Sequence, residues 1–122
     1  MNIVWFKRDL RVSDNAALSS AINCGNVLPL YIYEPALWQQ PDMSRRHYDF
    51  LNECLISLRA DLKSLGLTLV TKTGDTLNIL NSMHERYTVK SLWSHQETWN
   101  GWTYQRDIRV KQWALKNNIQ WN

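Results

Sequence analysis

The sequence predicts an α/β fold, a Rossmann-like doubly wound parallel sheet of about five strands with helices on both faces. Short apolar, β-branched runs alternate with segments whose apolar residues keep helical spacing. The links between successive runs are too long for hairpins, which favours parallel strands joined by right-handed crossovers. With 122 residues and 44% apolar content, the chain has the size of one domain and can bury a real core.

The first strand is predicted at residues 2–6, an apolar run that leads into charged residues without a hairpin turn. Such an apolar run is typical of a buried central strand that is followed by a helix. Ser13 or Asp14 is expected to cap that helix, because the side chains of both residue types accept free backbone N–H groups. The helix is expected to end at Gly25.

The second strand is predicted at residues 27–33. Pro29 is compatible with a strand only near its start or where no ladder donor is needed. Residues 34–43 contain two prolines and are predicted to form a long loop. Ser44 is expected to cap a helix whose apolar residues keep helical spacing until Gly66.

The remaining elements continue the alternation. A third strand is predicted at residues 67–71, and a shorter helix is expected to follow a cap at Asp75. The fourth strand is predicted at residues 89–93, the next helix at 103–116 and the beginning of a fifth strand at 119–121. No internal repeat, low-complexity tract or second domain is visible.

Composition sets limits on function. Fourteen basic and eleven acidic residues give a net charge of +3, with both signs mixed along the chain, which favours solvated helix faces over a nucleic-acid surface. Cys24 and Cys54 belong to no Cys-x-x-Cys pair and have no histidine at ligand spacing, so neither a disulfide nor a metal site is expected. No apolar leader or long apolar span is present, and a cytoplasmic location without membrane contact is predicted.

Two sequence blocks carry a resemblance. Residues 4–18 join an apolar strand ending in Trp-Phe to Lys-Arg-Asp-Leu-Arg, then to Asp-Asn and a helix. This pattern resembles the opening of DNA photolyases and cryptochromes, from which the chain departs mainly by Lys7 in place of an arginine. Residues 94–107 contain Glu-Thr, Asn-Gly-Trp-Thr-Tyr and Arg-Asp, which resemble a bacterial branch of the same family. The resemblance is collinear and spans essentially the whole chain.

The resemblance implies that residues 1–122 are the N-terminal α/β domain of such a protein. In this family the FAD, the DNA-binding face and the tryptophan electron-transfer chain belong to a helical domain that follows. The chain is therefore expected to be a fragment whose partner is its own missing C-terminal helical domain, with DNA bound through that domain only. The parent is expected to be a blue-light-dependent deoxyribodipyrimidine photo-lyase, a carbon-carbon lyase that repairs cyclobutane pyrimidine dimers, or a related cryptochrome. The fragment alone is expected to be inactive.

The family uses this domain to hold a light-harvesting antenna, which is methenyltetrahydrofolate, a hydroxy-deazaflavin or, in some members, a second flavin. Ligands of open parallel sheets bind beyond the carboxyl ends of the strands. In the loops expected there, Trp38, His95, Gln96 and Glu97 are the candidate antenna contacts, because they can stack on and hydrogen-bond a planar ring. An alternative is that the loop after the fourth strand mainly packs on the missing helical domain. No catalytic residue is predicted.

A second function hypothesis is a stand-alone small α/β module that binds a nucleotide or a partner protein and has no lyase activity. Such a module would show few exposed aromatic residues. Trp38, Trp99 and Trp102 argue against it, because all three are expected in loops. The same residues predict that the fragment self-associates through an exposed aromatic surface. A nucleotidyltransferase is not favoured, because the sequence has no His-x-x-His motif and no glycine-rich phosphate loop.

Overall fold

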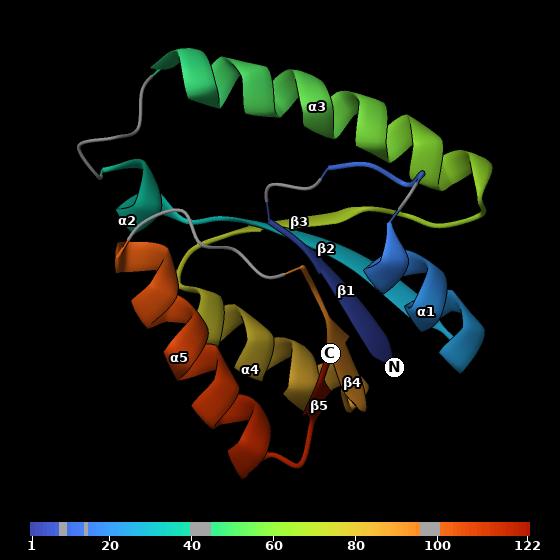
Figure 1. Cartoon of the computed structure of the whole chain (residues 1–122), viewed down its shortest axis with the longest axis vertical. Coiled ribbons are helices and arrows are strands. Elements are labelled where there is room, and N and C mark those ends of the chain that lie inside the picture. The colour runs from blue at the N-terminus through green and yellow to red at the C-terminus, as the bar shows by residue number, and fades with distance from the viewer. Residues whose placement is uncertain (8–9, 14, 40–44, 96–100) are drawn as a thin grey trace.

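The computed structural model describes residues 1–7, 10–13, 15–39, 45–95 and 101–122. It contains five strands and five helices within these ranges (Figure 1). The strands are β1 (Asn2–Phe6), β2 (Val27–Tyr33), β3 (Val70–Thr73), β4 (Ser91–Trp93) and β5 (Gln120–Trp121). The helices are α1 (Ala16–Cys24), α2 (Pro35–Trp38), α3 (Arg45–Ser64), α4 (Thr76–Tyr87) and α5 (Gly101–Lys116).

All five strands belong to one parallel sheet in the order β3-β2-β1-β4-β5. From β1 the chain adds β2 and then β3 on one side of the sheet. It then crosses to the other side of β1, where it forms β4 and β5. This reversal makes the carboxyl ends of β1 and β4 the topological switch point, where ligands of such folds bind. The predicted doubly wound α/β fold is confirmed.

Helices cover both faces of the sheet (Figure 1). Successive strand side chains alternate between the faces. Accordingly Val4 and Phe6 pack in one core cluster with residues of α1 and α3, whereas Ile3 and Trp5 pack in another with residues of α4 and α5. Pro29 lies opposite Val4 of β1, but the pairing of β2 with β3 begins one residue later, at Leu30, so no donor is needed from Pro29 on the β3 side.

The cap of α1 is Asn15 and not Ser13 or Asp14 as predicted. Its Oδ1 accepts a hydrogen bond from the backbone N–H of Leu18 at 3.0 Å, and its Nδ2 donates to the carbonyl of Arg11 at 2.9 Å. Asn15 is buried. Ser, Asp and Asn are all residue types that can cap, so the choice among positions 13–15 depends on where the helical backbone begins, at Ala16.

The third strand begins later than predicted, because residues 65–67 form the turn that ends α3. The N–H of Leu67 donates to the carbonyl of Leu62, and the N–H of Gly66 to that of Lys63, with Gly66 at φ 79°. These bonds form a Schellman-type helix end, which satisfies the last carbonyls of the helix. Pairing with β2 therefore starts only at Val70.

The predicted loop at residues 34–43 contains a short helix, α2, from Pro35 to Trp38. Proline is favourable at the first helical position, because its missing N–H needs no partner there. The carbonyl of Glu34 accepts hydrogen bonds from the N–H groups of Leu37 and Trp38. The two prolines predict a loop, but Pro35 occupies the first helical position, which favours proline. Residues 40–44 lie outside the described ranges.

None of the helices in the described ranges is long and apolar enough to cross a membrane. Cys24 and Cys54 are both free thiols, the first exposed and the second half-buried. Across the same part of the chain, no three His, Cys, Asp or Glu side chains come together in a way that could hold a metal ion.

Candidate functional site

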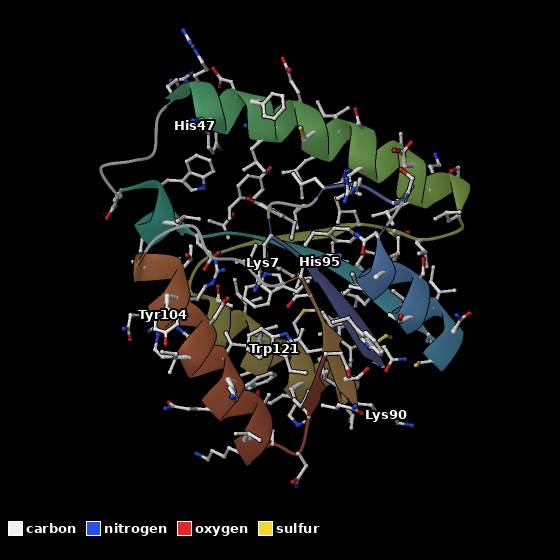
Figure 2. The ribbon with its side chains drawn as sticks, viewed as in Figure 1. Lys7, His47, Lys90, His95, Tyr104 and Trp121 are labelled. Atoms are coloured by element: carbon white, nitrogen blue, oxygen red, sulfur yellow. The ribbon has the colours of Figure 1, made fainter. Side chains whose placement is uncertain are left out.

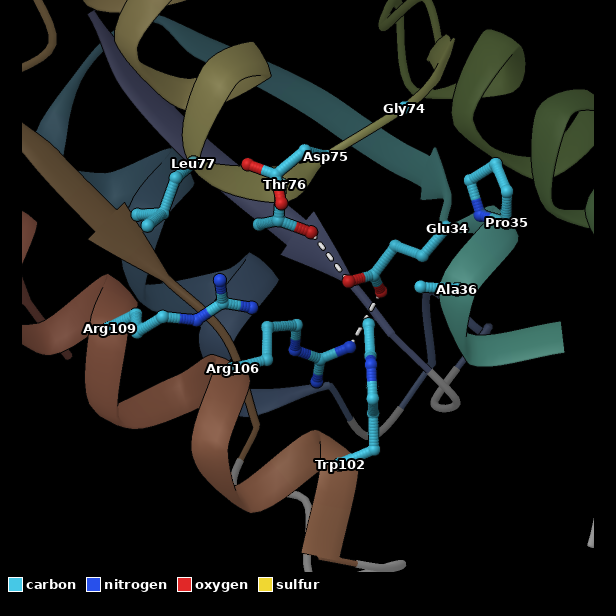
Figure 3. Close-up of a pocket in the computed structure, with 10 residues that line it drawn as sticks. All are labelled: Glu34, Pro35, Ala36, Gly74, Asp75, Thr76, Leu77, Trp102, Arg106 and Arg109. Carbon is cyan, nitrogen blue, oxygen red and sulfur yellow. Dashed lines mark hydrogen bonds and ion pairs between the residues drawn. The ribbon is translucent and has the colours of Figure 1, made fainter. Parts of the chain in front are cut away.

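A buried ion pair lies at the carboxyl edge of the sheet. Glu34 follows β2, and its Oε1 accepts a hydrogen bond from Nη1 of Arg106 on α5 at 2.6 Å. Its Oε2 accepts from the hydroxyl of Thr76, the first residue of α4, at 2.6 Å (Figure 3). The side chains of Arg106 and Glu34 are only 2% and 7% exposed. Both carboxylate oxygens are thus compensated, as a buried charge requires.

Asp107 extends this network to the end of β1. Its Oδ1 accepts from Nε of Arg106 and its Oδ2 from Nζ of Lys7, both at 3.1 Å. Lys7 and Arg106 also lie over the ring of Trp5, with Nζ at 4.5 Å and the guanidinium carbon at 4.9 Å from the ring centroid. The network therefore joins the ends of β1 and β2 to the starts of α4 and α5.

A cavity of about 250 Å³ lies beside this network, between the sheet edge, α2 and α3. We call it the α2–α3 cavity. Most of its walls are apolar or aromatic, with a few polar groups, which is the usual make-up of a small-molecule site. The lining residues are Phe6, Lys7, Leu10, Tyr31, Ile32, Glu34, Leu37, Trp38, His47, Phe50, Leu51, Cys54 and Arg106.

A second cavity, also of about 250 Å³, lies between α2 and the starts of α4 and α5 (Figure 3). Glu34 and Arg106 line this cavity as well as the α2–α3 cavity. Their ion pair is therefore a wall that the two cavities share. Trp102 also lines the second cavity and belongs to the first turn of α5, so its predicted position in a loop is wrong.

Trp38 is the predicted contact residue that lies in the α2–α3 cavity wall. It is half-buried at the end of α2, not in a loop as predicted, and its ring packs edge-on against Tyr48 at a centroid distance of 5.2 Å. The indole nitrogen is buried, and no described residue accepts a hydrogen bond from it. The position of Trp38 agrees with a role in ring binding, which stays a prediction.

His47 is a lining residue that the sequence analysis does not single out, because a histidine near the start of a helix is typical of a solvent-facing position. It is exposed, and it lies in the first turn of α3, next to α2 in Figure 2. Phe50, one turn further along, is also largely exposed and lines the cavity. The sequence shows only a large apolar residue near the start of the predicted helix, and the exposure of Phe50 in the structure marks the open side of the cavity.

His95 follows β4 near the end of β1 (Figure 2). Its Nε2 lies 2.9 Å from Oδ1 of Asn15, the cap of α1. His95 is not one of the described residues that line the α2–α3 cavity. Gln96 and Glu97 lie outside the described ranges. The structure thus brings His95 to the helix cap, and the proposed antenna role of these three residues stays a prediction.

Replacing Asn15 by alanine is expected to lower the free energy of unfolding by about 1–2 kcal/mol, because the N–H of Leu18 loses its acceptor and His95 loses its neighbour. Urea denaturation followed by circular dichroism measures the change. Asn78→Ala is the control, because Asn78 is an exposed residue in the first turn of α4. It is expected to change stability by no more than about 0.5 kcal/mol. Equal effects of the two substitutions would contradict the capping role.

Tyr33, at the end of β2, is expected to make stability sensitive to alkaline pH. Burial raises the pKa of its phenol above 10.0, with a further increase from Tyr48 and an opposing effect of Arg59. The folded state thus holds the phenol proton more tightly than the unfolded state. The stability that this provides is complete below pH 10 and is lost as pH rises through the raised pKa. Denaturation of wild type and Tyr33→Phe across this range is expected to show a smaller alkaline loss in the variant, and equal losses would contradict it.

Comparison with known proteins places the chain in a family. A model of the family described as DNA photolyase matches residues 2–122. The chain belongs to the DNA photolyase family. It is 34% identical over 105 residues, 80% of its length, to cryptochrome DASH, chloroplastic/mitochondrial, of Arabidopsis thaliana. It is 42% identical over 71 residues, 57% of its length, to the deoxyribodipyrimidine photo-lyase of Salmonella typhimurium.

A solved photolyase structure has the same fold. An archaeal photolyase from Sulfolobus tokodaii, solved with two FAD molecules, superimposes on 99% of the chain with a TM-score of 0.82 and 25% identity. The chain spans 18% of the Arabidopsis protein, 15% of the Salmonella protein and 28% of the Sulfolobus chain. This photolyase family chain therefore matches only one part of these much longer proteins.

Proposed function

We propose that this chain is the antenna domain of a photolyase or cryptochrome and that its α2–α3 cavity holds a planar light-harvesting chromophore. The observation that carries the proposal is the cavity itself, which lies beyond the carboxyl ends of β1 and β2, beside the switch point of the sheet. Its walls combine apolar and aromatic side chains, including Phe6, Leu37 and Trp38. Such walls accept a flat ring and keep water from its faces.

The residues that line the α2–α3 cavity suit a bound antenna better than a substrate that undergoes a reaction. A bound antenna absorbs light and passes on its excitation without making or breaking a bond. The protein then has only to fix the position of the ring and to exclude water. Glu34 and Arg106, the charged pair in the cavity wall, hydrogen-bond each other, and this arrangement suits a rigid wall. The buried N–H of Trp38 adds a donor for the edge of a heterocycle.

Three chromophores are compatible with this proposal: methenyltetrahydrofolate, a hydroxy-deazaflavin and a flavin. The Sulfolobus tokodaii relative, whose structure contains two FAD molecules and implies a novel light-harvesting cofactor, supports a flavin as the first ligand to test. A cavity of about 250 Å³ is below the usual range for drug-sized ligands, about 300–1,000 Å³. It therefore suits a ring system whose tail extends into solvent.

We further propose that this chain is part of a longer photolyase or cryptochrome and that the activity of the longer protein is that of its family. FAD and DNA would bind to a helical domain, which would be the partner of this chain, and light would drive repair of cyclobutane pyrimidine dimers or signalling. The isolated 122-residue chain is then expected to have no lyase activity. Its self-association through exposed aromatic residues and its cytoplasmic location stay predictions from the sequence.

Riboflavin titration of the 122-residue chain tests the antenna proposal. Saturable quenching or polarisation of flavin fluorescence is expected. Leu51→Trp fills the cavity and is expected to weaken binding at least about tenfold. Leu115→Trp, at a largely exposed position of α5, is the control and is expected to bind as wild type does. Circular dichroism confirms that both variants are folded. No saturable binding by wild type, or equal binding by both variants, would contradict the proposal.

A further inference from the structure

The indole N–H of Trp38 differs from those of the other tryptophans for which the structure gives a hydrogen bond. Its nitrogen is buried, and none of the residues that the structure describes accepts a hydrogen bond from it. Three other indoles, whose rings are also partly buried, each donate to a side-chain oxygen. These are Trp93 to Ser91 Oγ at 2.8 Å, Trp121 to Ser94 Oγ at 2.8 Å and Trp113 to Asn81 Oδ1 at 3.3 Å.

A buried donor without an acceptor is unfavourable, because the group has lost its hydrogen bonds to water and has gained none in exchange. Such groups are rare in native proteins and usually have a specific cause. Trp38 lies in the wall of the α2–α3 cavity, which is large enough for a ring system. An acceptor atom on a ligand in this cavity would remove the cost.

We propose that the Trp38 N–H donates a hydrogen bond to the bound chromophore and thereby selects a heterocycle with a carbonyl or ring-nitrogen acceptor on its edge. The inference rests on the antenna function proposed above. Neighbouring atoms cover the nitrogen in the present structure. The indole therefore has to turn on binding, away from its edge-on contact with Tyr48. The ring is half-buried and borders the cavity, so this turn brings its N–H to the edge of the bound ring.

The rotation of the Trp38 indole provides a second measurable sign of binding besides affinity. Loading the cavity changes the surroundings of the Trp38 indole, whereas Trp113 keeps its bond to Asn81. Trp113 packs against the other core cluster, on the α4 and α5 face of the sheet. The two indoles therefore report separately on the cavity and on the rest of the fold.

Replacement of Trp38 by 3-benzothienylalanine isolates the hydrogen bond, because the sulfur ring keeps the shape of indole but has no N–H. The variant is expected to bind riboflavin about tenfold more weakly than wild type, the order of one hydrogen bond. The same replacement at Trp113 is the control and is expected to leave the dissociation constant unchanged. In wild type with ¹⁵N-labelled indoles, riboflavin is expected to move the Trp38 N–H resonance and not that of Trp113.

The outcomes separate this inference from the proposed function. If wild type binds riboflavin in the cavity, but the Trp38 variant binds equally well and the Trp38 resonance does not move, the hydrogen bond is wrong and the antenna site stands. If wild type does not bind riboflavin at all, both the antenna site and the hydrogen bond are contradicted. Weaker binding together with a shifted Trp38 resonance supports both.

Discussion

Replacing Arg106 by alanine is expected to lower the free energy of unfolding by about 3–5 kcal/mol. The substitution leaves the carboxylate of Glu34 buried without the guanidinium that donates to its Oε1, while its Oε2 keeps the hydroxyl of Thr76. Removal of one member of a buried ion pair is costly because the remaining charge has lost both water and its counter-charge. Asp107 loses a donor as well. Urea denaturation at pH 7 measures the loss.

Two comparisons make this result specific. Arg45→Ala breaks the exposed Arg45–Asp49 pair on α3, whose side chains are 88% and 61% exposed, and is expected to cost no more than about 0.5 kcal/mol. Joint replacement of Glu34 by leucine and Arg106 by methionine removes both buried charges and is expected to recover most of the stability. A loss below about 1 kcal/mol for Arg106→Ala would show that the pair is not desolvated as the structure has it.

Leu58→Ala is expected to lower the free energy of unfolding by about 2–5 kcal/mol. Leu58 is fully buried on α3, in the core cluster that includes Val4 and Phe6 of β1. Shortening the side chain removes apolar contacts and leaves a void that close-packed neighbours fill only in part. The same denaturation experiment measures the change, and an unaltered slope with urea would show that the folded state is otherwise intact.

Ile56 provides the matched control for Leu58, two residues earlier on the same helix. It is 72% exposed, so Ile56→Ala is expected to change stability by no more than about 0.5 kcal/mol. The difference between the two variants measures the packing of α3 on the sheet, because helix propensity changes little between them. Similar losses at both positions would mean that α3 does not pack on the sheet with the face that carries Leu58.

The fold could be predicted because each strand and helix is encoded by local periodicity. The apolar run at residues 2–6 and the helical spacing on α3 both indicated the observed elements. Element ends were less predictable, because they depend on hydrogen bonds that no periodicity shows. The bond from Leu67 to Leu62 delays β3, and the acceptor carbonyl of Glu34 allows a short helix where prolines predicted a loop.

The candidate site was only partly predictable. Trp38 was found because an isolated tryptophan stood in a segment expected at the carboxyl edge of the sheet. The pair of Glu34 and Arg106 was missed, because 72 positions separate the two residues and no local pattern joins them. A signal did exist. Arg106 lies three residues after Thr103 and four before Val110, on the buried face of α5, where an arginine requires a buried partner.

The central claim is that the α2–α3 cavity binds a planar chromophore, and the most direct test is to locate bound riboflavin. NMR spectra of leucine methyl groups in the 122-residue chain give the position. Saturation with riboflavin is expected to shift the methyl resonances of Leu10, Leu37 and Leu51, which line the cavity, and to leave those of Leu80 and Leu115 in place. Shifts confined to Leu80 and Leu115, or no shifts at saturating ligand, would contradict the claim.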